Sequence, residues 1–367
     1  MDYPIMNKKA VRKNKEVRKA QKFAKKYYGR VRGIAPKARL DKMISMEQLP
    51  YKDLTGKMDS IHTLLERKQL EFVSKEDFLS WVEQSGLTGL SGDGFATASK
   101  LRSFFETKEN ERYLIVNAVN CDPGLIHDEW IIENRQDAVI SGIECIKKFS
   151  SFEKVMIATK RKPSAGDSTL LVQVPNRYPM GEERILIENL LGIRLAANEY
   201  PTDHGILVMN VQTIMAIGMG EFESRYLTVT DMTKAKGVVV KTPIGLNITD
   251  VIKQVMPENK DASIYTGCGA MSAHLADEAE KVTYSTNFIG YGKAPDYANA
   301  TACKGCGGCT KRCPAGVSVH KIIQAVERND RSKIDTFGAK NCIGCSSCTY
   351  ICHAGKNVME IVSGVMD

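Results

Sequence analysis

The 367-residue sequence predicts an α/β core, then a small module of strands, then a C-terminal cysteine-rich domain. Apolar, β-branched runs alternate with helical patterns over residues 76–222, which is typical of a sheet covered by helices on both faces. Two short β-type runs follow, and two cysteine runs with identical spacing lie near the end of the chain. These observations predict an N-terminal arm (1–75), an α/β domain (76–222), a β module (223–260), a connecting loop segment (261–300) and a cysteine-rich domain (301–367).

Each element is predicted from a local pattern. A helix capped by Ser74 is expected to end at Gly86. Contiguous apolar residues predict strands at 113–117, 155–158, 169–174 and 206–210, with helices at 137–148, after Gly181 and at 211–217. In the β module, strands at 226–230 and 237–241 precede a helix at 248–255. A polar helix is expected at 272–280 in an otherwise irregular segment, and another helix at 320–328 between the cysteine runs.

The two C-terminal cysteine runs both read C-x2-C-x2-C-x3-C. This is the spacing of bacterial two-cluster ferredoxins, in which the fourth cysteine of each run ligates the other cluster. We therefore expect one [4Fe–4S] cluster on Cys303, Cys306, Cys309 and Cys352, and a second on Cys342, Cys345, Cys348 and Cys313. Zinc is the rival metal, but zinc sites usually show separated C-x2-C pairs. The runs predict that the protein transfers single electrons.

Composition and cysteine use indicate the compartment. A hydrophobic content of 43% is that of a globular protein. Outside the two runs, Cys121, Cys145 and Cys268 show no regular spacing, which together with the clusters favours a reducing compartment. No stretch approaches the roughly 18 apolar residues that span a bilayer, and no secretory pattern follows the basic N-terminus. We expect a cytoplasmic protein, either soluble or peripheral to a membrane complex.

The positive charge is confined to the N-terminal arm. Residues 1–50 contain 15 Lys and Arg against 4 Asp and Glu, and the rest of the chain has a slight negative balance. A solvated basic helix and a docking arm for a partner reductase or electron-carrier protein both fit this pattern. Nucleic acid is not an expected partner, because no recognition motif or aromatic platform accompanies the charge.

A glycine-rich stretch lies between the first predicted helix and the first strand. Gly89, Gly92 and Gly94 precede the pattern Phe95-x-Thr-x-x-Lys100. Glycines allow positive φ angles and a close approach of backbone amides to a phosphate, and such a loop opening a helix is an anion site. An ordinary flexible loop is the alternative, and a Walker loop is excluded because no Gly-Lys-Ser/Thr follows.

The order of motifs resembles a known family. The glycine-rich stretch, residues 115–123, Tyr-Pro-Met-Gly-Glu-Glu at 178–183, Asn-Val-Gln-Thr at 210–213 and the cysteine runs occur in that order. Together they resemble the flavin- and NADH-binding subunit of respiratory complex I. The resemblance is closer to the C subunit of the Rnf electron-transport complex and its short soluble relatives, such as the electron-transfer protein associated with proline reductase. Residues 226–256 look like the family's soluble-ligand-binding (SLBB) β-grasp module, and residues 266–271 look like its glycine/methionine loop.

The resemblance implies a site for flavin mononucleotide (FMN) and NADH. The implied FMN-binding residues are Gly89, Gly92, Gly94, Lys100, Asn117, Asn120, Gly181, Glu182, Glu183 and Asn210. NADH would stack on the flavin with Phe95 as a platform, and Asp122 or Glu183 would hold its ribose as the catalytic candidates.

The expected function is therefore that of an NADH-dependent oxidoreductase subunit, which passes electrons between NADH, FMN and a partner protein through the two clusters. Two departures from the family pattern favour an alternative. Asp93 stands where alanine is usual, and Asn120 replaces an acid. A carboxylate beside a phosphate is unfavourable. The alternative is a flavin-free iron–sulfur relay or scaffold subunit of a larger reductase complex.

Overall fold

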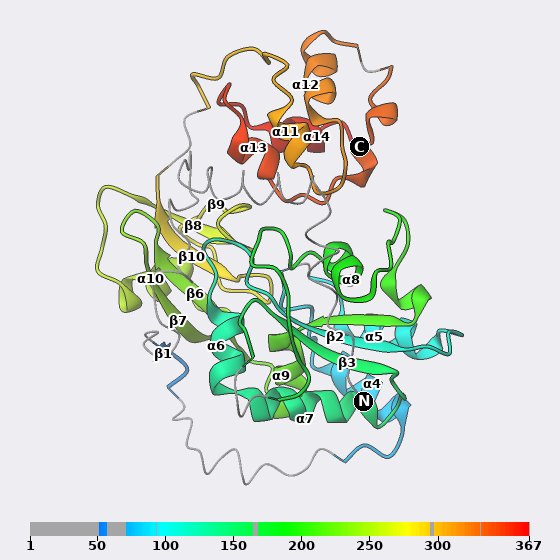
Figure 1. Ribbon diagram of the computed structural model, residues 1–367. Coiled ribbons are helices and arrows are strands. Elements are labelled where there is room, and N and C mark those ends of the chain that lie inside the picture. Colours follow the sequence, from blue (N-terminus) through cyan, green and yellow to red (C-terminus); the bar gives the residue numbers. More distant parts are fainter. Residues whose placement is uncertain are drawn as a thin grey trace.

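The computed structural model describes residues 51–56, 71–92, 94–163, 168–293, 297–330 and 332–366. It contains a four-stranded sheet wrapped by helices, a six-stranded sheet beside it, and a C-terminal helical domain. In Figure 1 the C-terminal domain lies at one end of the molecule, above α8 and the β8–β9 end of the second sheet. The predicted mixed α/β architecture is confirmed.

The first sheet is parallel and has the order β4-β3-β2-β5. Its strands are β2 (Tyr113–Ala118), β3 (Lys154–Thr159), β4 (Leu171–Gln173) and β5 (Ile206–Asn210). Successive residues point to opposite faces, so Leu114 and Val116 enter one core while Ile115 enters the other. Because both faces are buried, these strands are continuous apolar runs, which is why the sequence predicts them well.

Helices cover both faces of this sheet. One face packs against α4 (Lys75–Gln84), α5 (Thr97–Glu106), α6 (His127–Asn134), α7 (Gln136–Lys147) and α9 (Val211–Met219). The other packs against α8 (Glu183–Leu191), and a 3₁₀ turn, η3 (Pro201–His204), precedes β5. The predicted cap of α4 is present, since the hydroxyl of Ser74 accepts a hydrogen bond from the backbone N–H of Asp77 at 3.1 Å.

Helices α7 and α9 cross at two glycines. A Cβ added at Gly142 would overlap the carbonyl oxygen of Ile214, and one at Gly218 would overlap the backbone of Ala138 and Gly142. We therefore expect Gly142→Ala to lower the free energy of unfolding by about 3 kcal/mol, the upper end of the usual cost of overpacking a core. Urea titration followed by circular dichroism measures this change.

The matched control is Glu144→Ala, on the exposed side of α7. Glu144 forms an exposed ion pair with Lys147 at 2.8 Å, so its loss should cost no more than about 0.5 kcal/mol. Equal stability of the two variants would contradict the close backbone contact between the helices.

The second sheet has the order β1-β7-β6-β10-β8-β9. Its strands are β1 (Tyr51–Asp53), β6 (Ser224–Asp231), β7 (Lys236–Pro243), β8 (Ser263–Gly267), β9 (His274–Leu275) and β10 (Phe288–Gly292). Helix α10 (Ile248–Val255) covers one face, where Ile248, Val251 and Ile252 are fully buried. The other face contributes Tyr226 and Val239 to the core of the α/β domain.

The prediction of a connecting loop over residues 261–300 is wrong, because this segment supplies β8, β9 and β10. The prediction of a helix at 272–280 is also wrong, since β9 lies there instead. The central strand β10 contains Gly290, whose missing side chain makes room for the ring of Phe288 and for Thr230. Glycine is rare in strands, so a segment that contains it does not look like a strand in the sequence. The close packing against Gly290 therefore requires the residue that made β10 hard to predict.

Part of the predicted N-terminal arm belongs to the folded body. Strand β1 pairs in parallel with β7, and the ring of Tyr51 stacks on that of Trp130 with centroids 4.5 Å apart. The remaining expectations about the arm fall on residues 1–50 and 57–70, which lie outside the described residues.

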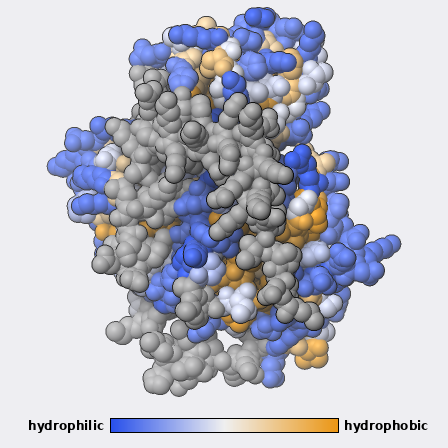
Figure 2. Space-filling view, in the orientation of Figure 1, coloured by the Kyte–Doolittle hydropathy of each residue, from blue (hydrophilic) through white to orange (hydrophobic). Residues whose placement is uncertain are grey.

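The C-terminal domain is built from short helices around the cysteines. They are α11 (Gly308–Arg312), α12 (Val319–Glu327), α13 (Ser347–Ile351) and α14 (Val358–Ser363), with 3₁₀ turns η4 (Asp335–Phe337) and η5 (Ala339–Asn341). On the face seen in Figure 2, hydrophilic residues dominate this domain and apolar residues lie among them. Among the residues that the structure describes, no helix has both the length and the apolar character needed to cross a membrane.

Candidate cofactor sites

A cavity of about 210 Å³ lies at the carboxyl ends of β2 and β5. Strand β2 pairs with β3 on one side and with β5 on the other, so the order of the strands reverses at β2. Such a switch point is where α/β sheets bind ligands. Of the predicted site residues, the cavity is lined by Asn117, Asn120, Asp122, Gly181, Glu182 and Asn210. Its opposite wall comes from Ile343, Gly344 and Cys345 of the second cysteine run.

Two residues that the sequence did not single out form hydrogen bonds with the backbone of the glycine loop, residues 89–94. Arg225 donates to the carbonyl of Leu90 and to the side-chain oxygen of Asn287. Asn287 in turn donates to the carbonyl of Ser91 at 2.7 Å. Burial lowers the pKa of Arg225 to about 9, so the guanidinium remains a cation at neutral pH beneath the loop. No local pattern marks Arg225, which lies in a strand far along the chain.

Gly92 packs against the glycine/methionine loop, residues 266–271. It has a φ of +105°, and an added Cβ would lie 2.6 Å from the sulfur of Cys268. The Cys268 thiol donates to the carbonyl of Gly92 at 3.3 Å. A glycine is required here both by the backbone conformation and by this close approach. Asp93, one of the two departures from the family pattern, lies outside the described residues.

The predicted charged residues already have partners within the protein, and of them only Asp122 and Glu182 line the cavity. Lys100 and Glu183 form an ion pair at 2.6 Å. Glu182 caps α8, where its carboxylate accepts from the backbone N–H of Ile185 at 3.0 Å. The ring of Phe95 is 52% exposed. Among the described residues, Gly89, Gly92, Gly94, Phe95, Lys100 and Glu183 lie outside the cavity lining.

Asp122 ties the glycine/methionine loop to the α/β domain. Its carboxylate accepts hydrogen bonds from the backbone N–H groups of Gly124 (3.1 Å), Ala270 (2.8 Å) and Met271 (3.1 Å). An added Cβ at Gly269 would lie 2.5 Å from this carboxylate. The position predicted to bind a ribose therefore already binds three backbone amides, and its role toward NADH stays a prediction.

We expect Asp122→Ala to lower the free energy of unfolding by about 3 kcal/mol, because it leaves two buried N–H groups and one partly buried N–H group without this acceptor. Urea titration followed by tryptophan fluorescence measures this, since Trp81 and Trp130 both lie in the adjoining domain. Asp137→Ala, at an exposed site on α7, is the control and should change stability by less than about 0.5 kcal/mol. An equal effect of the two variants would contradict the anchoring role of Asp122.

A buried polar network forms the floor of the cavity. Asn120 donates from its amide to Asp128 at 2.9 Å, and Asn210 donates to the same carboxylate oxygen at 3.2 Å. Lys160, which follows β3, donates to the carbonyl of Asn120 and pairs with Glu129 at 3.0 Å. Two of the three asparagines predicted to touch a ligand, Asn120 and Asn210, are thus fixed by Asp128. The sequence did not reveal Asp128, because no local pattern marks the buried first turn of α6.

Both cysteine runs fold in the same way, with a repeat of 39 residues. The positions flanking the second cysteine are left-handed in each run, at Gly305 and Gly307 and at Gly344 and Ser346. The hydroxyl of Thr310 accepts from the backbone N–H of His320, and that of Thr349 from Met359, at 3.0 and 2.7 Å. Each run therefore presents two cysteines on a loop, a third near the start of a short helix and a fourth directly after that helix.

The fourth cysteine of the first run lies near thiols of the second run. Burial and the neighbouring Cys342 raise the pKa of Cys313, and burial together with Cys313 and Cys342 raises the pKa of Cys345. Cys309 interacts in the same way with Cys303 and Cys306. Sulfur-only ligand sets of four suit an iron–sulfur cluster. Cys352 completes the first set only by prediction. Within the described residues, no three side chains meet as they would around a single metal ion.

Burial also raises the pKa of the metal-free thiols, to about 11 at Cys309 and about 12 at Cys348. A bound metal must therefore supply the energy to deprotonate them.

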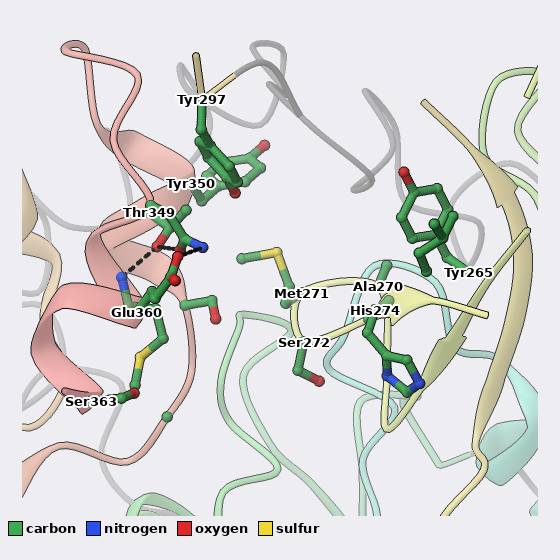
Figure 3. A pocket seen from close by; sticks show the side chains of 16 residues that line it. Tyr265, Ala270, Met271, Ser272, His274, Tyr297, Thr349, Tyr350, Glu360 and Ser363 are labelled. Atoms are coloured by element: carbon green, nitrogen blue, oxygen red, sulfur yellow. Dashed lines mark hydrogen bonds between the residues drawn. The ribbon is translucent and has the colours of Figure 1, made fainter. Parts of the chain in front are cut away.

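A second cavity, of about 420 Å³, lies between the glycine/methionine loop and the C-terminal domain. Ser272 and Gly344 line both this cavity and the first. Figure 3 shows Met271 extending from its loop toward Thr349 and Tyr350, while Tyr265 and His274 lie on the opposite side. On the far wall, Asn357 bonds with Thr349 at 3.4 Å and with Glu360 at 2.8 Å.

Comparisons with known proteins agree with this geometry. Residues 82–219 match the Nuo51 FMN-binding domain family, and residues 295–353 match a 4Fe-4S dicluster domain family. The C subunit of the ion-translocating oxidoreductase complex of Haemophilus influenzae (strain PittEE) is 29% identical over 312 residues, covering 77% of this chain and 46% of the relative. The protein of the same name from Pseudomonas aeruginosa PAO1 is 29% identical over 258 residues, covering 65% of this chain and 33% of the relative. The predicted resemblance to the Rnf C subunit is confirmed, although the chain spans less than half the length of these relatives.

Solved structures share the fold. The NAD+-reducing [NiFe]-hydrogenase in its H2-reduced state superposes with a TM-score of 0.56 at 17% identity, over 83% of this chain and 62% of the other. Its air-oxidized state gives 0.58 at 18% identity, over 96% and 71%. At these identities the likeness concerns the fold alone.

Proposed function

We propose that this chain is an oxidoreductase subunit that passes electrons between NADH and a partner protein, through FMN in the first cavity and two [4Fe–4S] clusters in the C-terminal domain. One observation carries the proposal: the wall of the cavity at the sheet edge contains a cluster cysteine. Cys345 lines this cavity, and the hydroxyl of Tyr178 donates to its carbonyl at 2.8 Å. A ligand there lies beside a cluster site.

The residues present suit the ring end of a flavin. Amide side chains from Asn117, Asn120 and Asn210 meet in the cavity, and one carboxylate oxygen of Asp128 is buried without a hydrogen-bond partner among the described residues. The volume of about 210 Å³ is below the roughly 300–1,000 Å³ usual for small-molecule sites. A complete FMN therefore exceeds this cavity, and the ring end is the part that we propose to lie in it. FMN, when bound, supplies the exchange between a two-electron donor and single-electron carriers.

The position of Cys345 gives the two clusters an order. The set Cys342, Cys345, Cys348 and Cys313 lies next to the cavity and would receive electrons first. The set Cys303, Cys306, Cys309 and Cys352 would pass them to the partner. In this arrangement the protein orients the centres and excludes water between them.

The remaining assignments are proposals of the same kind. Phe95 is exposed and is proposed to stack on NADH, with Glu183 and Asp122 as the ribose-binding candidates. The six-stranded sheet with α10 corresponds to the β-grasp module, although it extends to residue 292. The basic residues 1–50 are proposed to dock a partner reductase or electron carrier, and the protein to act in the cytoplasm, where the likeness to Rnf subunits suggests a position peripheral to a membrane complex.

Anaerobic purification of the full chain, followed by iron and flavin analysis, tests the proposal. We expect about eight irons and one FMN per chain, the iron count following from two [4Fe–4S] clusters, and bleaching of the flavin absorbance by NADH. A preparation with full iron that neither contains nor binds FMN would exclude this function.

A flavin-free relay subunit is the second candidate. The small volume of the cavity, the Lys100–Glu183 ion pair and the bonding of Asn120 to Asp128 favour it. Titration of the iron-loaded chain with FMN separates the two candidates: saturable binding supports the flavoprotein, and its absence at millimolar FMN supports the relay.

A further inference from the structure

Asp128 is an unusual residue for the floor of a cavity. It lies in the first turn of α6, lines the cavity at the sheet edge, and is 5% exposed. A carboxylate at a helix N-terminus is common, but a buried one normally has every oxygen bonded.

The two carboxylate oxygens of Asp128 have different surroundings. Oδ2 accepts hydrogen bonds from the side-chain amides of Asn120 and Asn210. Oδ1 is buried without a hydrogen-bond partner in the part of the chain that the structure describes, where Nε2 of His127 is 3.6 Å away. Two donors therefore fix Oδ2 as an acceptor. Oδ1 is the atom left to carry a proton.

Charged groups from every adjoining element face this carboxyl group. His127 and Glu129 lie beside it on α6, Lys160 follows β3, and Arg225 lies on β6. Burial outweighs the two cations and raises the pKa of Asp128 to about 7. Burial, aided by Arg225, lowers the pKa of His127 to about 3, so the imidazole beside Oδ1 is neutral.

We propose that Asp128 carries a proton on Oδ1 and donates it as a hydrogen bond to the ligand of this cavity. The geometry selects a ligand with an uncharged acceptor atom, such as the ring carbonyl or imine nitrogen of a heteroaromatic group. This rests on the proposed function, in which the ligand is the flavin ring. Asn120 and Asn210 act as positioning residues, because they orient the carboxyl group and leave only Oδ1 for the ligand.

The test is Asp128→Asn in the full, iron-loaded chain. An asparagine can place its oxygen where Oδ2 lies and its NH2 where Oδ1 lies, so it imitates the protonated carboxyl group at every pH. Wild-type affinity for FMN should fall about tenfold more than that of D128N between pH 6 and pH 8, because only the wild type loses the proton. The phosphate of FMN titrates equally in both proteins and cancels in the comparison.

An infrared pH titration of the same chain without FMN gives a second readout. The wild type should show a protonated carboxylic acid band that disappears near pH 7 and is missing in D128N. Asp137→Asn, at an exposed site on α7, should behave like the wild type in both experiments.

The outcomes separate the two proposals. Parallel pH dependence of FMN affinity in the wild type and D128N overturns the hydrogen bond from Asp128, while the flavin function stands. Absence of the infrared band at pH 5.5 overturns the proton on Oδ1, whatever the chain binds. If neither protein binds FMN at any pH, the flavin function fails and the donated bond with it, and the infrared band alone then decides whether Oδ1 holds a proton.

Discussion

Replacing Cys345 with serine is expected to stop electrons from leaving the cavity while NADH still bleaches the flavin. Cys345 both lines the cavity and belongs to the cysteine set that includes Cys313. Loss of a thiolate ligand should remove that cluster and lower the iron content from about eight to about four per chain. Reduction of an external one-electron acceptor should fall to the background rate, because the remaining cluster lies on the far side of the lost one.

The matched variant is Cys306→Ser, which removes a ligand from the other run. It should lose the same amount of iron, yet NADH should still reduce its remaining cluster, which electron paramagnetic resonance detects in frozen samples. Cys313→Ser should behave like Cys345→Ser, although Cys313 belongs to the first run in the sequence. Wild-type reduction of the remaining cluster in Cys345→Ser would contradict the proposed order of the clusters.

The sequence predicted those features that depend on local pattern. The middle residues of strands β2, β3 and β5 are apolar because both faces are buried, and α10 begins and ends where its periodicity predicts. The eight cysteines are readable because a cluster requires a fixed short spacing. Asn117 and Asn210 were named because the family resemblance implies them, and both lie at the carboxyl ends of neighbouring parallel strands, where polar residues converge at one edge of a sheet.

Other features of the site depend on tertiary contacts that no local pattern reports. Arg225 and Asn287 support the glycine loop from a different sheet, 135 and 196 residues away in sequence from their bonded partners Leu90 and Ser91. The segment around His127 and Asp128 contains several charged residues and was not predicted as a helix, yet it forms the buried start of α6. Asp122 looked like a ligand-binding acid, and only the fold reveals the three amides whose hydrogen bonds it accepts.

The buried pair His127 and Asp128 should influence stability in opposite directions as pH falls. The pKa of His127 is about 3 in the folded chain against 6.5 ordinarily, so below pH 6.5 only the unfolded chain takes up a proton and stability decreases. The pKa of Asp128 is about 7 against 3.8, so between these values the folded chain holds a proton that the unfolded chain releases, and stability increases as pH falls. In the wild type these two contributions nearly cancel.

Single substitutions should therefore reveal large and opposite pH effects. D128N retains only the histidine contribution. Its free energy of unfolding should fall by on the order of 3 kcal/mol between pH 7 and pH 4, whereas that of the wild type should change little. His127→Gln retains only the carboxyl contribution and should gain on the order of 3 kcal/mol over the same range. Urea titrations at several pH values, followed by the fluorescence of Trp81 and Trp130, measure both slopes, and Asp137→Asn supplies the reference. Identical slopes in the two variants would mean that neither group is buried in the protonation state inferred from the structure.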